Sequence, residues 1–136
     1  MDKEMTPAYW PRIKFFKPHE FVCSHCGAEH MQKDTVLRLD LLRERLNTPL
    51  ILSSAYRCPE HPIEKAKVDK GGKPGVHSTG HAIDIACNGE LAYRILTHAP
   101  SIGFNRIGVN QKGSGRFIHL DDYVGSEFVR MVCWSY

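Results

Sequence analysis

Apolar residues recur every three or four positions in two stretches of the chain, which is the spacing of a helix with one buried face. The first predicted helix covers residues 34–46, with Asp34 as its capping residue, and it stops before Pro49. The second covers residues 89–98 and follows Asn88, which is also a good capping residue. The residues predicted to form the buried stripes are Val36, Leu39, Leu42 and Leu46 in the first helix and Leu91, Ala92 and Ile95 in the second.

Short apolar runs and alternating runs predict four strands. Residues 50–54 form an apolar run, and residues 81–87 alternate so that every second side chain shares a face. Residues 106–109 and 116–121 are predicted to pair as a hairpin, because the glycine-rich turn 111–115 joins them.

The remaining segments predict irregular structure. Residues 59–76 are rich in proline and glycine and are predicted to be a long loop. Residues 1–20 are expected to wrap over the core, with their aromatic rings packed on it. The pattern as a whole predicts one α+β domain over residues 1–136, with a small, mostly antiparallel sheet and helices on one side of it.

Composition excludes several classes of protein. The net charge is only +3, and no basic stripe alternates with aromatics, so nucleic acid is not an expected partner. No apolar run approaches the roughly 18 residues that a membrane span needs. The first residues lack the basic-then-apolar layout of a secretory signal, so we expect synthesis in the cytoplasm. The protein is expected to be a monomer.

Eight histidines and five cysteines direct attention to metal chemistry. Asp84 lies within an apolar strand, where an ionised carboxylate is costly unless it is paired or binds a metal. Gly80 allows the preceding loop to bring His77 toward Asp84, and His119 joins them if the strands 81–87 and 116–121 are neighbours. Two imidazoles and a carboxylate form a catalytic zinc set with an open fourth position. Taken singly, each residue could instead be a satisfied core residue.

The cysteines allow three interpretations. Cys23 and Cys26, with Cys58 and His61, form a C-x-x-C plus C-x-x-H set that could hold a structural zinc ion if the two loops meet. The alternatives are buried thiols or a disulfide bond. Cys87 and Cys133 lie in apolar, strand-like runs and are predicted to belong to the core.

Four segments, in the same order, resemble the zinc D-alanyl-D-alanine carboxypeptidase family, which also includes phage L-alanyl-D-glutamate endolysins and the related Hedgehog fold. The most specific segment, His77-x-x-Gly80-x-Ala82-x-Asp84, is similar to the family signature H-x-x-G-x-A-x-D. Residues 21–27 are similar to the motif F-x-C-x-x-C-G of the short phage and prophage branch. Residues 53–59 are similar to the family segment S-G-Y-R-C-P, and residues 117–121 are similar to the family strand F-V-H-V-D. The resemblance implies a Hedgehog/D,D-peptidase-like fold, Zn²⁺ held by His77, Asp84 and His119, and an arginine, Arg57, that faces the substrate.

The chain departs from the family pattern at two positions. Arg116 stands where many relatives have a carboxylate three residues before the last histidine ligand, and it cannot accept a proton. Asp121 is then the first choice for the general base, or else an acceptor that orients a ligand imidazole. Asp122 and His81 are further choices for the base. Gly75 replaces the serine at the start of the signature.

These features predict zinc-dependent hydrolysis of an amide bond in peptidoglycan stem peptides, by a D,D-carboxypeptidase or an endopeptidase. The lysine-rich segment 59–76 would line the groove or form an ordinary solvated loop. The resemblance and the missing signal together suggest an endolysin that acts on the cell wall after release by a phage. The competing hypothesis is a zinc-binding, Hedgehog-like module that binds cell wall or protein without catalysis.

Overall fold

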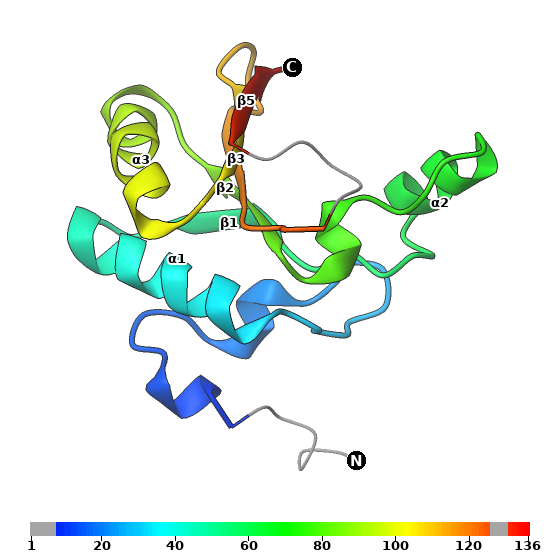
Figure 1. Cartoon of the computed structure of the whole chain (residues 1–136), viewed down its shortest axis with the longest axis horizontal. Helices are drawn as coiled ribbons and strands as arrows, with labels where there is room; N and C mark the ends of the chain where they lie inside the picture. Colours follow the sequence, from blue (N-terminus) through cyan, green and yellow to red (C-terminus); the bar gives the residue numbers. More distant parts are fainter. Residues whose placement is uncertain (1–7, 126–130) are drawn as a thin grey trace.

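A five-stranded sheet divides the molecule into two sides (Figure 1). The computed structural model describes residues 8–125 and 131–136. The strands are β1 (Ile51–Ser54), β2 (Ala82–Ala86), β3 (Arg106–Asn110), β4 (Phe117–Asp121) and β5 (Val132–Ser135), and their order in the sheet is β1-β2-β4-β3-β5. Three of the four pairings are antiparallel, and β5 lies parallel to β3. The expected α+β class with a mostly antiparallel sheet is therefore confirmed.

The two predicted helices cover one face of the sheet. They are α1 (Lys33–Leu46) and α3 (Gly89–Ile102), which pack on each other. The predicted stripes are buried, except that Leu91 is only partly buried. Ile83, Ile85, Ile118 and Leu120 face these helices as fully buried side chains of the sheet. Helix α1 begins one residue earlier than predicted, so that Asp34 lies in its first turn and Gln32 is at the cap position.

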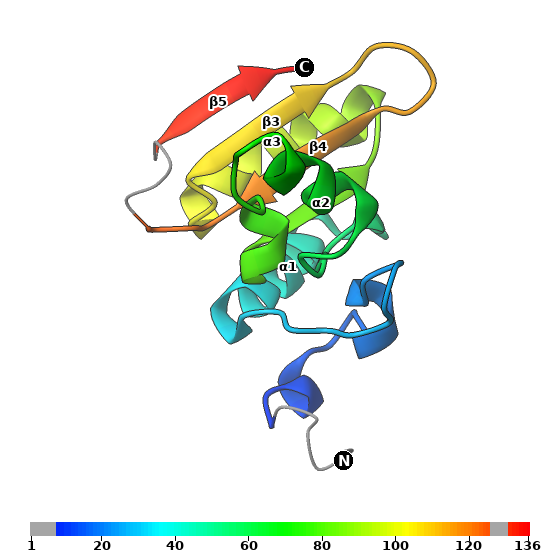
Figure 2. The same ribbon diagram turned by 90° about the vertical axis from the view of Figure 1, so that its right-hand side faces the viewer.

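The segment 59–76 is not the loop that its composition predicts. Residues Pro62–Asp69 form helix α2, and Val76–Thr79 form the short 3-10 helix η4. Pro62 suits the first helical position, and the side chain of His61 caps the helix by accepting a hydrogen bond from the Ile63 N–H. Helix α2 lies on the opposite side of the sheet from α1 and α3 (Figure 2), so the expectation of helices on one side only is wrong.

The ends of the chain are partly as predicted. Tyr9, Trp10 and Phe16 are buried in the core, whereas Phe15 is 40% exposed. The sequence patterns do not predict β5, and Cys133 on this strand is exposed, not in the core. Cys87 is buried as predicted. Within the described residues, no helix has the length and apolar character needed to cross a membrane.

Candidate metal centre

The strand register places Asp84 and His119 directly opposite each other. Asp84 of β2 and His119 of β4 are cross-strand partners. Because side chains alternate along a strand, both point away from the face that carries the buried isoleucines and Leu120. His77 reaches them from η4, which ends at Gly80 with a φ of 82°. Glycine is required at position 80 because this backbone conformation strains other residues and because a Cβ would collide with the carbonyl oxygen of His30. The three predicted ligands are thus brought together, and all are buried.

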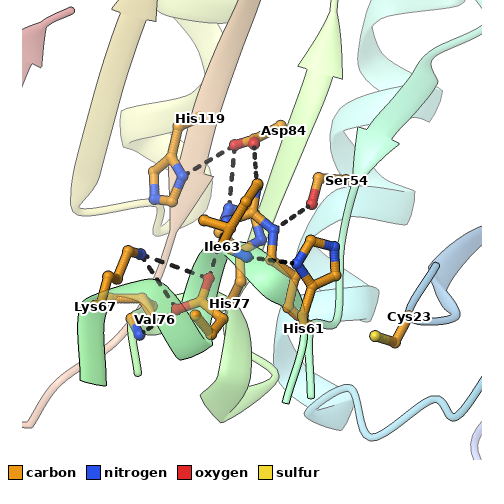
Figure 3. Close-up of polar contacts among 12 residues, drawn as sticks. Cys23, Ser54, His61, Ile63, Lys67, Val76, His77, Asp84 and His119 are labelled. Atoms are coloured by element: carbon orange, nitrogen blue, oxygen red, sulfur yellow. Dashed lines mark hydrogen bonds and ion pairs between the residues drawn. The ribbon is translucent and has the colours of Figure 1, made fainter. Parts of the chain in front are cut away.

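The geometry of these three side chains suits one metal ion. Nε2 of His77 lies 3.3 Å from Oδ1 of Asp84, and Nδ1 of His119 lies 3.0 Å from the same oxygen (Figure 3). The ligand atoms all lie within 4.8 Å of one another. His77 donates its Nδ1–H to the carbonyl oxygen of Ala55 at 2.7 Å, which fixes the tautomer with its lone pair on Nε2. Two nitrogens and a carboxylate oxygen form a zinc set with one position left open.

Asp121 lies behind the ligand set. Its Oδ2 is 2.6 Å from Nε2 of His119, the ring nitrogen that does not face Asp84. The carboxylate is fully buried, and it also accepts hydrogen bonds from Nε of Arg106 and from the Tyr123 N–H. Asp121 thus contacts the imidazole of His119 on the side away from Asp84.

The side chains of the ligand cluster shift one another's pKa values. Burial alone would raise the pKa of Asp84, but its contacts with the imidazoles of His119 and His77 hold it far below its usual value. Burial alone would lower the pKa of His119, but its hydrogen bonds to Asp121 and Asp84 raise the pKa above the usual value. The metal-free cluster therefore keeps Asp84 ionised and favours a proton on His119.

Arg57 lies beside the cluster and is held by three groups. Its Nε donates to Oγ of Ser54 at 3.1 Å, its Nη1 donates to Oε2 of Glu64 at 3.0 Å, and its Nη2 lies 3.6 Å from Oδ2 of Asp84. Glu64 is fully buried on α2 and also accepts from Nζ of Lys67 and from the Gly75 N–H. The hydrogen bonds from Gly75, Arg57 and Lys67 outweigh the effect of burial and lower the pKa of Glu64.

The same contacts explain the glycine at position 75. A Cβ on Gly75 would lie 2.6 Å from Nζ of Lys67 and 3.2 Å from Oε1 of Glu64. A side chain at this position would push aside the end of Lys67 and crowd Glu64, the residue that holds Arg57. Nothing in the sequence pattern pointed to Glu64, which lies in a segment of apparently solvated charges.

A cleft of about 380 Å³ opens over the metal ligands. Its wall includes Arg57, Lys67 and Arg106, which are cationic, and Ile63, Phe117, Trp134 and Tyr136, which are apolar or aromatic. The ring of Trp134 packs 5.2 Å from that of His119, centroid to centroid, over Gly108. Of the predicted lysine-rich segment, Lys67 lines this cleft, whereas Lys65 faces Asp69 at the exposed surface. The sequence patterns do not indicate Trp134 or Tyr136, because they do not predict β5.

The other predicted residues have different surroundings. Arg116 is exposed and donates from Nε to the carbonyl oxygen of Gly113. Asp122 accepts from Thr35 and Arg38 of α1 and contacts Nδ1 of His81, so its carboxylate is engaged away from the ligand cluster.

The cysteine set is only partly assembled. The sulfur atoms of Cys23, Cys26 and Cys58 come together, and none of them forms a disulfide. His61 does not join this group of sulfur atoms: its Nδ1 caps α2, and its Nε2 lies 3.1 Å from Oγ of Ser24.

Comparison with known proteins supports the assignment of the metal centre. A protein-family model described as Peptidase M15 matches residues 14–121, a range that includes the three ligands and Arg57. No curated protein matches the chain. Peptidases of this family depend on zinc, which agrees with the donor set of His77, Asp84 and His119. Because the family match covers most of the sequence and the whole ligand set, the chain belongs to the M15 family of zinc peptidases.

Proposed function

We propose that this protein hydrolyses an amide bond in the stem peptides of peptidoglycan. The observation that carries the proposal is the buried His77–Asp84–His119 set, which opens into a cleft with cationic and aromatic walls. Zinc in such a three-ligand site supplies Lewis acidity toward a carbonyl oxygen and toward water.

The walls of the cleft suit a short peptide that carries free carboxylates. Among the described residues, the charged side chains that line it besides the three metal ligands are Arg57, Lys67 and Arg106. Stem peptides carry carboxylates at their C-terminus and on their acidic residue, and a planar guanidinium binds a carboxylate well. Trp134 and Tyr136 offer apolar surface for the small D-amino-acid side chains. Action at the cell wall after release at phage lysis follows from this substrate and from the sequence resemblance.

The chain's own residues have distinct roles in this proposal. Ala55 holds His77 in the tautomer that leaves Nε2 ready for the metal, and Asp121 holds the ring of His119 from behind. Ser54 and Glu64 fix the orientation of Arg57, which positions the peptide. Asp121 is therefore a positioning residue in this assignment, not the general base.

One observation favours a second candidate function, that of a zinc-binding module without catalysis. Among the described residues, Asp84 is the single carboxylate that lines the cleft, and it belongs to the metal set. A carboxylate that takes a proton from water is thus not in place at the cleft wall.

Digestion of purified peptidoglycan separates the two functions. The zinc-loaded protein is incubated with murein, and the released muropeptides are identified by mass spectrometry, which also names the bond that is cut. We expect new peptide ends with the wild-type protein and none with His119→Ala. The matched control is His98→Ala, a half-buried histidine of α3 outside the cleft, and it should behave as wild type. A folded, zinc-loaded wild-type protein that releases nothing from any murein would leave the binding module as the function.

A further inference from the structure

We propose that Cys23, Cys26 and Cys58 bind a second Zn²⁺ ion, separate from the metal centre of the cleft. The three sulfur atoms lie within 4.8 Å of one another. Two belong to the turn that follows the 3-10 helix Pro18–Phe21, and the third belongs to the segment that follows β1. Three soft sulfur ligands that converge in this way suit zinc better than calcium or magnesium.

The backbone around these sulfur atoms is built as a ligand turn. Gly27 has a φ of 77°, and its N–H closes the turn by donating to the carbonyl oxygen of Cys23 at 2.8 Å. Two further N–H groups, those of His25 and Cys58, point at Sγ of Cys23 from 3.4 and 3.3 Å. Donors aimed at a sulfur atom stabilise the thiolate, which is the form that binds metal.

The alternative interpretations fit this arrangement less well. A thiol that merely fills the core is buried among apolar groups, yet Cys26 is exposed and Cys58 is half-buried. A disulfide would join two of the three sulfur atoms and would leave the third next to the bond, whereas one zinc ion uses all three.

His61 is not the fourth ligand in this arrangement. Its Nδ1 accepts a hydrogen bond from the Ile63 N–H, so its proton resides on Nε2, which faces Oγ of Ser24. Coordination through either nitrogen would break one of these contacts. Because Cys26 is exposed, solvent reaches the cluster and can supply the fourth ligand.

The position of this second metal suggests what it does. Cys58 directly follows Arg57, and the Arg57 N–H donates to the carbonyl oxygen of His77 at 3.2 Å. The Tyr56 N–H donates to the carbonyl oxygen of Phe21, just before the cysteine turn. A zinc ion across the three sulfur atoms would therefore fasten the irregular N-terminal segment to the backbone that presents Arg57.

Metal content and cobalt spectroscopy on the full chain test the proposal. We expect two zinc ions per wild-type chain, one per Cys58→Ser chain and one per His119→Ala chain. Cobalt-substituted wild type should show thiolate-to-cobalt charge-transfer absorption, which Cys58→Ser loses and His119→Ala retains. The exposed cysteine of β5 provides the control, because Cys133→Ser should retain both metal ions and the absorption.

Two results would overturn the second site. One is the absence of charge-transfer absorption in the cobalt-substituted wild type, together with equal zinc contents in wild type and Cys58→Ser. The other is a disulfide between two of Cys23, Cys26 and Cys58, found by peptide mapping of the purified chain as a loss of two hydrogens. If Cys58→Ser does not fold, the exposed Cys26→Ser takes its place. A loss of zinc in His119→Ala but not in the cysteine variants would leave the proposed function standing and this site refuted.

Discussion

The two ring nitrogens of His119 face two different carboxylates, and the roles proposed for Asp84 and Asp121 rest on this division. Nδ1 faces Asp84 in the metal set, and Nε2 faces Asp121 at 2.6 Å. A carboxylate behind a ligand imidazole fixes the ring and raises the basicity of the ligand nitrogen. Asp121 is also held by Arg106 and by the Tyr123 N–H, so it has little freedom to exchange protons with the cleft.

Asp121→Asn tests this role against that of a general base. We expect zinc affinity to fall by about 10–100-fold, because the imidazole loses its ionised partner. Most of the activity on murein should return at saturating zinc. Affinity is measured by competition with a chelator, and melting temperature reports on folding. An unchanged zinc affinity with activity lost at saturating zinc would identify Asp121 as the base instead.

A second prediction at the scale of residues concerns the contribution of Glu64 to stability. It is fully buried and accepts hydrogen bonds from Arg57, Lys67 and the Gly75 N–H. Glu64→Gln removes the charge but keeps the shape, so the partly buried guanidinium loses its counter-charge. We expect the free energy of unfolding in urea to fall by about 3 kcal/mol. Glu60→Gln, an exposed residue near α2, should change it by less than about 0.5 kcal/mol. Equal effects of the two substitutions would refute the structural role of Glu64.

At the scale of elements, one row of residues crosses the whole sheet through the metal centre. Ser54, Asp84, His119, Gly108 and Trp134 are successive cross-strand partners on β1, β2, β4, β3 and β5. Glycine at position 108 leaves room for Trp134, because a Cβ there would lie 2.6 Å from its ring and the ring would have to shift. The missing side chain allows Trp134 to lie over the row and to reach the ring of His119.

Gly108→Ala should therefore disturb the cleft without removing a metal ligand. We expect Trp134 to shift, kcat/KM on muropeptides to fall by about tenfold, and zinc content to stay the same. Gly115→Ala, in the turn before β4, is the control, since nothing lies within 4 Å of a Cβ there. Wild-type activity in Gly108→Ala would show that Trp134 has no part in binding substrate.

The sequence predicts those helices and strands whose pattern of apolar residues is local. The stripes of α1 and α3 follow from spacing alone, and the alternation in β2 and β4 placed Asp84 and His119 on sheet faces where pairing could join them. Helix α2 has no such stripe, because the side chain that it buries fully is a carboxylate, Glu64. Its position depends on partners far along the chain, which no local pattern contains. Likewise, the purpose of Gly108 is evident only once β5 is known to lie beside β3.

At the scale of the whole molecule, Asp122 fastens helix α1 to the sheet. It follows β4, and it accepts hydrogen bonds from Thr35 and Arg38 of α1 while also contacting His81 just before β2. Burial alone would raise its pKa, but the hydrogen bonds from His81, Thr35 and Arg38 outweigh burial and lower the pKa. The ionised form is thus the one that the fold stabilises.

This shift determines how stability should depend on pH. A carboxylate whose pKa is lower in the folded state stabilises the fold fully above its unfolded pKa, about 3.9 for aspartate, and loses this effect as the pH falls through the folded pKa. Asp122→Asn cannot titrate, so its free energy of unfolding should lie about 1.5–3 kcal/mol below that of wild type at pH 7. The difference should narrow as the pH falls below about 4, since only the wild type then loses the interaction. Urea unfolding of both proteins from pH 7 to below pH 4 measures this difference in the free energy of unfolding. A difference that stays constant into acid would mean that Asp122 acts through packing and not through its charge.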